Sequence, residues 1–253
     1  MILFLLPDHD YDPTESAVPW AALRDAGIPV RFATPEGRVA LADDRLVEQG
    51  FSFLSPLLMT RRDALHDYDR MREDPDFQSP LAYSDVVDAE VTGVVVPGGH
   101  APGMKSMLES TTAQTIFGNA ILAGKPVAAV CHGVLLAARA KDPSTGLSVL
   151  HDRQTTAVTA TLELSAWNLT RLRLGTYYRT YPQTVQTEVT AALRNPHQFK
   201  RGPLLPQRDS ATHLNRGFTV RDANYLSARW PGDCHRLAAE YRDLVLENRN
   251  AAR

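Results

Sequence analysis

The feature that most constrains this chain is a short apolar run, Pro126 to Val130, which ends abruptly at Cys131. The run is β-branched or small, and the Gly and Pro that flank it leave no polar face for water, which predicts a buried parallel strand. The residues over 134–140 are instead Leu- and Ala-rich helix formers, with Gly133 between the two patterns. Cys131 is therefore expected on a tight strand-to-helix turn, which Gly133 allows the backbone to make.

A cysteine on such a turn is a candidate nucleophile. The turn lifts the thiol above the edge of the sheet, close to the free N–H groups of a helix N-terminus, which stabilise a thiolate. We therefore predict a depressed pKa for Cys131, with His132 as its neighbour. The competing interpretation is a small core residue, because free cysteine is among the most buried residue types.

Composition excludes several classes of protein. A chain of 253 residues with 43% hydrophobic content can bury one large core, so we expect a single α/β domain over 1–253. The net charge of −2 gives no electrostatic reason to bind nucleic acid or an anionic membrane. No apolar run approaches the roughly 20 residues of a membrane span, and the apolar opening at 1–6 lacks a basic region before it. With only Cys131 and Cys234, a reduced cytoplasmic protein is predicted.

The N-terminal residues predict a strand–helix–strand unit. Strands are expected at 2–6 and 30–34, joined by a helix that Thr14 caps and Gly27 ends. Pro19 is expected in or near the first turn of this helix, where its missing N–H is tolerated. Glu15 then lies at the carboxyl edge of the sheet, where open α/β sheets bind ligands. Its alternative role is a first-turn acid that the helix dipole favours.

A long polar stretch interrupts the alternation of strands and helices at about 38–84, which predicts an insertion. Within it, Arg61 to Asp74 is rich in charges, and Leu65, Tyr68 and Met71 are spaced three apart. This spacing predicts an amphipathic helix with a solvated face. The alternative, a metal cluster around its His66, is weaker, so no metal site is predicted.

A further buried strand at 91–96 runs into Gly98, Gly99 and His100. A pair of glycines directly after a strand offers backbone N–H groups that no side chain shields, which suits half of an oxyanion hole. A plain turn is the alternative. A crossover helix is expected at 111–123, leading back to the strand that ends at Cys131.

The C-terminal half is less regular in pattern. A strand is expected at 155–159, followed by Glu163, and then an irregular second insertion over 167–215 that would form a lid, a dimer contact or both. A hairpin is predicted over 218–228. The closing helix is predicted from Gly232, with fraying from Asn248.

Taken together, these motifs resemble the ThiJ/PfpI superfamily of class I glutamine amidotransferase-like proteins, nearest its stress-inducible chaperone/glyoxalase III branch. The resemblance is carried by Ala128-Ala-Val-Cys-His-Gly133, Val96-Pro-Gly-Gly-His100, Thr14-Glu-Ser-Ala-Val-Pro19 and Phe32-Ala-Thr-Pro-Glu-Gly37. It implies a flavodoxin-like, three-layer α/β/α sandwich with a mostly parallel sheet. It also implies a homodimer.

The resemblance also implies roles for individual residues. Cys131 would be the nucleophile, His132 its base, and Glu15 the acid that faces the thiol. Glu163 matches the place of the third triad member. The oxyanion hole would be formed by Gly99 and the backbone N–H of His132, with Gly98 and His100 beside the substrate.

The segment Ser227 to His235 departs from the family pattern. Because it follows the final strand, it should reach the same sheet edge as Cys131. We predict that Arg229 holds a substrate carboxylate and that Trp230 covers the substrate. In the alternative, Asp233 neutralises Arg229 and Trp230 only packs.

The residues themselves suit 2-oxoaldehyde chemistry, which needs a soft nucleophile, a base and oxyanion donors, and neither a metal nor an organic cofactor. We therefore predict a glyoxalase III-like enzyme, a lyase or hydrolase acting on a small electrophile. Isonitrile hydration, or hydrolysis of a small amide or thioester, would use similar groups. A holding chaperone, or an oxidative-stress sensor that works through Cys131, is the non-enzymatic alternative. An amidotransferase is disfavoured because no downstream His-x-Glu pair exists.

Overall fold

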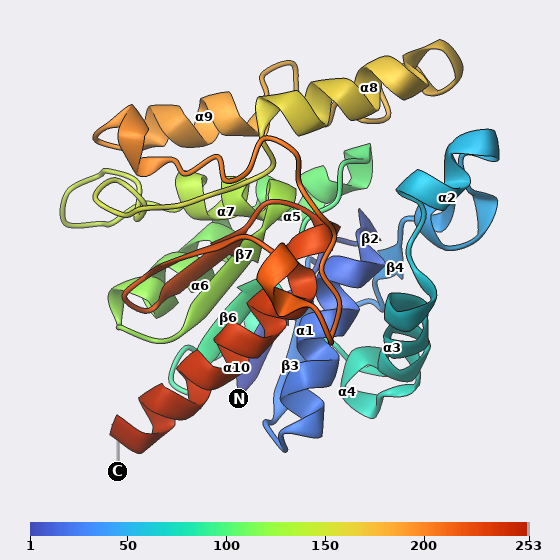
Figure 1. Ribbon diagram of the computed structural model, residues 1–253. Coiled ribbons are helices and arrows are strands. Elements are labelled where there is room, and N and C mark those ends of the chain that lie inside the picture. Colours follow the sequence, from blue (N-terminus) through green and yellow to red (C-terminus); the bar gives the residue numbers. More distant parts are fainter. Residues whose placement is uncertain (252–253) are drawn as a thin grey trace.

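A seven-stranded sheet forms the centre of the computed structural model, which describes residues 1–251 (Figure 1). The strand order is β5-β3-β1-β6-β7-β9-β8, and every pair is parallel except the hairpin of β8 and β9. The strands are β1 (Ile2–Leu5), β3 (Val30–Thr34), β5 (Leu81–Ala82), β6 (Gly93–Val96), β7 (Val127–Val130), β8 (Thr219–Asp222) and β9 (Tyr225–Ala228). A separate short pair joins β2 (His9–Tyr11) to β4 (Leu41–Ala42). The predicted mostly parallel α/β sandwich is confirmed.

Helices cover both faces of the sheet. The helices α1, α3 and α10 pack together in one layer, and α6 and α7 belong to the other, with α9 on α7. The bounds are α1 (Pro13–Asp25), α2 (Ser55–Leu58), α3 (Arg62–Glu73), α4 (Pro75–Gln78), α5 (Lys105–Leu108), α6 (Thr111–Leu122), α7 (Val134–Arg139), α8 (Ala160–Leu174), α9 (Val185–Ala192) and α10 (Cys234–Ala251). The four central strands β1, β6, β7 and β9 are buried at every position, which explains why Ser227 in β9 is the one polar residue in them.

The start of α1 differs from the sequence prediction. Asp12 is the N-cap, since its carboxylate accepts hydrogen bonds from the backbone N–H groups of Thr14 and Glu15. The cap therefore lies two residues earlier than predicted, the helix begins at Pro13, and Pro19 lies in its interior. Because proline has no N–H, the carbonyl of Glu15 loses its usual partner four residues on. Gly27 does follow the helix with φ +68°, as predicted.

The predicted strand at 155–159 is wrong. Thr155 makes only an isolated parallel bridge to Phe199, and its hydroxyl contacts that of Tyr225 at 2.8 Å. These residues are buried because they pack against side chains of β9, Tyr225 and Ser227, so their β-branched pattern reflects burial and not strand pairing.

The region predicted to be irregular over 167–215 contains two helices. Helix α8 begins at Ala160 behind its cap Thr159 and carries Glu163 in its first turn, and α9 is capped by Thr184. Figure 1 shows the two helices end to end in one row across the top of the view, above α7 and α5. Helix α10 continues to Ala251, although residues 248–251 are largely exposed, so the predicted fraying of this end stays a prediction.

The polar stretch at 38–84 supplies α2, α3 and α4. Helix α3 is amphipathic as predicted and buries Ala64, Tyr68 and Met71. No group of acidic, His or Cys side chains suited to a metal ion occurs within residues 1–251. Within the same residues, no helix is both long enough and apolar enough to cross a membrane.

Candidate active site

The candidate nucleophile lies where β7 ends. Cys131 has φ +55°, in the left-handed region, and begins a single 3-10 turn that leads into α7. A non-glycine residue in this region is strained, and such strain concentrates at functional sites. Gly133 has an ordinary helical backbone, so its role is different from the one predicted. A Cβ there would lie 2.6 Å from the carbonyl oxygens of Val96 and Pro97, so glycine lets β6 approach the turn.

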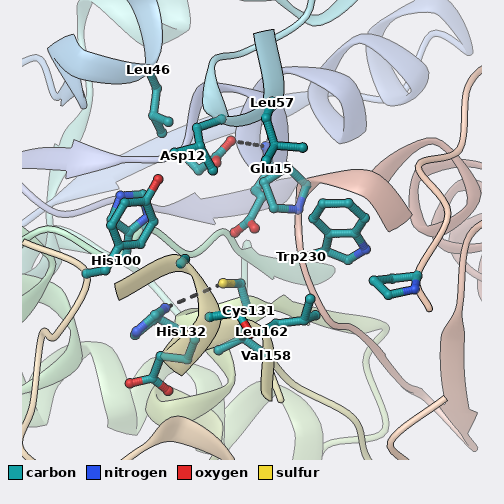
Figure 2. Close-up of a pocket in the computed structure, with 18 of the residues that line it drawn as sticks. Asp12, Glu15, Leu46, Leu57, His100, Cys131, His132, Val158, Leu162 and Trp230 are labelled. Atoms are coloured by element: carbon teal, nitrogen blue, oxygen red, sulfur yellow. Dashed lines mark hydrogen bonds between the residues drawn. The ribbon is translucent and has the colours of Figure 1, made fainter. Parts of the chain in front are cut away.

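Glu15 and His132 lie on two sides of the Cys131 sulfur (Figure 2). The His132 Nδ1 atom is 3.4 Å from the sulfur. The Glu15 carboxyl is fully buried, and its Oε2 accepts a hydrogen bond of 2.7 Å from the N–H of Gly98. Within residues 1–251, its Oε1 has no hydrogen-bond partner, and Figure 2 shows the carboxyl directed toward the sulfur. Three reactive groups from α1 and the turn after β7 thus meet at one point.

The pKa values of these groups reflect their burial. Burial, together with the nearby Asp12 carboxylate, raises the pKa of Glu15 well above its ordinary value. Burial lowers the pKa of His132 to about 3, so its imidazole is neutral at physiological pH. Burial and the carboxylates of Glu15 and Asp12 raise the pKa of the Cys131 thiol, although the N–H of His132 favours the thiolate.

The predicted depression of the Cys131 pKa is therefore reversed. The sulfur is only 7% exposed and faces two carboxyl groups, and these effects outweigh the helix N-terminus, since α7 has only six residues. The site stabilises neutral partners: a protonated carboxyl, a neutral imidazole and a thiol.

Alkylation of Cys131 by iodoacetamide, followed by peptide mass spectrometry, measures this directly. We expect the midpoint of the rate against pH to lie above the ordinary value of about 8.5. Mass spectrometry separates Cys131 from the fully buried Cys234. A wild-type midpoint below 8.5 would restore the sequence prediction.

The other predicted site residues divide into those that line the pocket and those that do not. Gly99, His100, Glu163 and Trp230 line the same cavity as Cys131, which has a volume of about 330 Å³. Figure 2 shows His100 and Trp230 on either side of the sulfur. The His100 ring stacks on Tyr178 with centroids 3.9 Å apart, and burial lowers its pKa to about 3.

Gly98 does not face the substrate space. Its N–H is bound to Glu15, and a Cβ there would lie 2.7 Å from the Glu15 Oε2 atom and 2.8 Å from the His132 nitrogen. Gly98 therefore positions the Glu15 carboxyl. Gly99 does line the cavity, and its N–H makes no hydrogen bond with residues 1–251.

Glu163 reaches the cavity but does not hydrogen-bond to His132 within the described part of the chain. Its Oε2 accepts from the N–H of Val185 at 2.9 Å, and its Oε1 lies 3.8 Å from the Arg179 guanidinium. Burial raises its pKa. A role as the third triad member remains a prediction.

Arg229 does not line the cavity with Cys131, so its predicted contact with substrate is corrected. The guanidinium is 1% exposed and forms a two-pronged pair with Asp233, at 2.8 and 2.9 Å. A hydrogen bond to the carbonyl of Pro203 occupies a further N–H. The alternative weighed from the sequence, neutralisation by Asp233, is what the structure shows.

Sequence reasoning missed Asp12, Tyr178 and Arg208, all of which line the cavity. Asp12 could have been found, because an Asp directly before a Pro is typical of a helix N-cap followed by N1 proline. Tyr178 and Arg208 lie in segments without a periodic pattern, so no local signal places them near Cys131.

Comparison with known proteins supports the sequence resemblance. A family model described as ThiJ/PfpI family-like matches residues 6–203. An uncharacterised protein of Schizosaccharomyces pombe is 33% identical over 119 residues, which are 46% of this chain and 43% of that protein. The glutathione-independent glyoxalase hsp3102 of the same yeast is 28% identical over 150 residues, which are 57% of this chain and 58% of that protein. The matches thus span about half the length of these relatives.

Solved structures show a similar fold over nearly the whole chain. The glyoxalase III of Candida albicans superposes with a TM-score of 0.70 at 17% identity, covering 96% of each chain. The DJ-1beta of Drosophila melanogaster superposes with a TM-score of 0.55 at 15% identity, covering 99% of this chain and 96% of that one. At these identities the likeness concerns the fold.

Proposed function

This chain belongs to the ThiJ/PfpI family, and we propose that it is a cysteine-dependent glyoxalase that converts a 2-oxoaldehyde into a 2-hydroxy acid. One observation carries the proposal: a thiol, a carboxyl group and an imidazole meet in a cavity that buries all three. The relatives named for glyoxalase activity make this chemistry the first to test.

The first step is addition of the Cys131 thiol to the aldehyde carbon. The C–S bond forms as the C=O π bond breaks, and the S–H proton ends on the former aldehyde oxygen. Because the site disfavours isolated charges, this proton moves during the attack. His132 Nδ1, 3.4 Å from the sulfur, is placed to relay it. The product is a neutral hemithioacetal.

The second step moves hydrogen between the two adjacent carbons. Neutral His132 takes the proton from C1, while the protonated Glu15 carboxyl gives its proton to the ketone oxygen on C2, which forms an enediol. His132 then returns a proton to C2, and the C1 hydroxyl returns its proton to Glu15. This leaves a thioester of the 2-hydroxy acid. A raised Glu15 pKa and a lowered His132 pKa set the required starting states.

The third step is hydrolysis of the thioester. Water adds to the thioester carbon, the C–S bond breaks, and the sulfur recovers its proton as the acid leaves. The N–H of Gly99, which has no partner within residues 1–251, would stabilise the oxyanion of this step together with the N–H of His132. The net reaction consumes one 2-oxoaldehyde and one water and yields one 2-hydroxy acid.

A substrate panel tests the proposal. Methylglyoxal, phenylglyoxal, an isonitrile, a small amide and a thioester are assayed without added thiol, on the wild type and on Cys131→Ala. We expect 2-hydroxy acid from the two oxoaldehydes, and a loss of at least about 10³-fold in kcat/KM for Cys131→Ala. Turnover of the isonitrile alone, or equal rates for the two proteins, would refute the proposal.

A further inference from the structure

The cavity that holds Cys131 contains one arginine that the proposed chemistry does not use. We propose that Arg208, with the indole ring of Trp230, forms a subsite that binds a carboxylate carried by the substrate. The substrate class is then an anionic 2-oxoaldehyde with a flat or extended apolar body. This inference rests on the proposed function, because it names the substrate of the same site.

Among residues 1–251, the guanidinium of Arg208 has no hydrogen-bond or ion-pair partner. It makes no hydrogen bond to residues 1–251 and lies within 4.0 Å of no carboxylate among them. In contrast, the buried or half-buried guanidinium groups of Arg24, Arg139 and Arg229 each bind a carboxylate, at distances of 2.6 to 2.8 Å. A guanidinium that lines a cavity, carries a permanent charge and has five free donors is suited to a carboxylate, which it can bind through two parallel hydrogen bonds.

Trp230 packs against this guanidinium. The Arg208 Cζ atom lies 4.8 Å from the centroid of the indole ring, within the range of a cation–π contact. This contact restrains the guanidinium and leaves its N–H donors unoccupied.

Two carboxylates whose charges act on Arg208 each accept hydrogen bonds from backbone N–H groups. Asp12 attracts its charge, but the Asp12 carboxylate caps α1 through the N–H groups of Thr14 and Glu15. Asp209 accepts from the N–H of Arg236 at 2.8 Å. These groups lower the cost of burying Arg208 and leave its donors unoccupied.

The size of the cavity and its other lining residues indicate the size and polarity of the rest of the ligand. A volume of about 330 Å³ is far more than the five heavy atoms of methylglyoxal need, and lies at the lower end of the range for drug-sized ligands. Apart from the groups already described, the lining is mostly apolar: Leu46, Leu57, Leu58, Val158, Leu162, Ala166, Leu169, Pro206 and Pro231. An apolar body with a single anionic end fits this lining.

The test compares two substrates of the same shape, 4-carboxyphenylglyoxal and 4-carbamoylphenylglyoxal. For Arg208→Gln we expect kcat/KM to fall about 10- to 150-fold on the carboxylate, the equivalent of a hydrogen bond to a charged group. For the same variant, kcat/KM on 4-carbamoylphenylglyoxal should fall less than about 3-fold. Arg208→Lys should recover part of the loss, because it keeps the charge without the fork. Arg216→Gln, an exposed arginine, is the matched control and should change neither value.

A binding measurement separates this inference from the proposed reaction. Calorimetric titration of Cys131→Ser with 4-acetylbenzoate should show binding that is lost in the Cys131→Ser, Arg208→Gln double variant. If neither glyoxal is turned over but this binding depends on Arg208, the reaction is wrong and the subsite stands. If both glyoxals are turned over and Arg208→Gln lowers them equally, or if 4-acetylbenzoate binds the double variant as well, the subsite is refuted.

Discussion

Glu15→Gln is expected to lower kcat/KM for a 2-oxoaldehyde by roughly 10²- to 10⁴-fold, the usual contribution of a general acid. Glutamine keeps the oxygen that accepts the 2.7 Å hydrogen bond from Gly98, so the carboxyl position is preserved. It cannot give up a proton to the substrate ketone. The loss should fall on kcat and kcat/KM together, because the proton is donated only in the transition state.

The same variant should unfold at an equal or higher temperature at neutral pH. The folded pKa of Glu15 is raised above the unfolded value of about 4.3. Between these two pKa values the folded state binds more protons, so stability is greatest below the unfolded pKa and falls as the pH rises toward the folded one. Because glutamine does not ionise, the variant does not lose this stability as the pH rises. Activity of the wild type should likewise decline as the pH rises through the raised pKa, and the variant should lack that decline.

Glu73→Gln, at the exposed end of α3, is the matched control and should leave turnover and the melting temperature unchanged. Should Glu15→Gln keep its activity and lose several degrees in Tm, Glu15 would be a first-turn acid that stabilises α1, the alternative raised by its sequence position.

Arg229→Ala is expected to destabilise the fold by about 3–5 kcal/mol, because it leaves the Asp233 carboxylate buried and without its charge partner. This is a large part of the roughly 5–15 kcal/mol that stabilises a typical domain. Chemical denaturation monitored by circular dichroism measures the change. Arg221→Ala, which breaks an exposed pair with Glu247 at 2.6 Å, should cost at most about 1 kcal/mol.

A double variant tests the cause. In Arg229→Met with Asp233→Asn, no charge remains buried, and the asparagine oxygen can still accept from the N–H of Phe218. Part of the lost stability should return. Turnover of the anionic and the neutral arylglyoxal should fall in the same ratio in Arg229→Ala, since Arg229 does not line the cavity. A loss confined to the anion, with stability intact, would restore the role in recognition predicted from the sequence.

Local sequence patterns were sufficient to predict those parts of the fold that depend on burial and on neighbouring residues in the chain. The run Val127–Val130 could only be buried on both sides, and the change to helix formers after Cys131 put the thiol on a turn. Glu15 could be placed near that turn because the loop after β1 shares the carboxyl edge of the parallel sheet. These are arguments about adjacent residues and one topological rule.

Long-range pairing was beyond such arguments. The sequence around Thr155 has the composition of a strand, yet whether it pairs depends on what lies beside it, and β9 already has β7 and β8 as neighbours. Helices α8 and α9 were missed because their stability comes largely from packing against distant segments and their periodicity is weak.

The sequence by itself determined most strands of the sheet, the turn that holds Cys131 and the imidazole next to it, because each follows from the order of adjacent residues. The Glu15 carboxyl followed from one further rule, that parallel strands end at a common edge. Only the tertiary structure decided the charge states of the groups around Cys131, and which arginine lines the cavity. The thiol pKa depends on burial by α8 and on the Glu15 and Asp12 carboxylates. Arg229 and Arg208 are alike as sequence, but Asp233 pairs with Arg229, whereas Arg208 lines the cavity and has no carboxylate within 4.0 Å among residues 1–251.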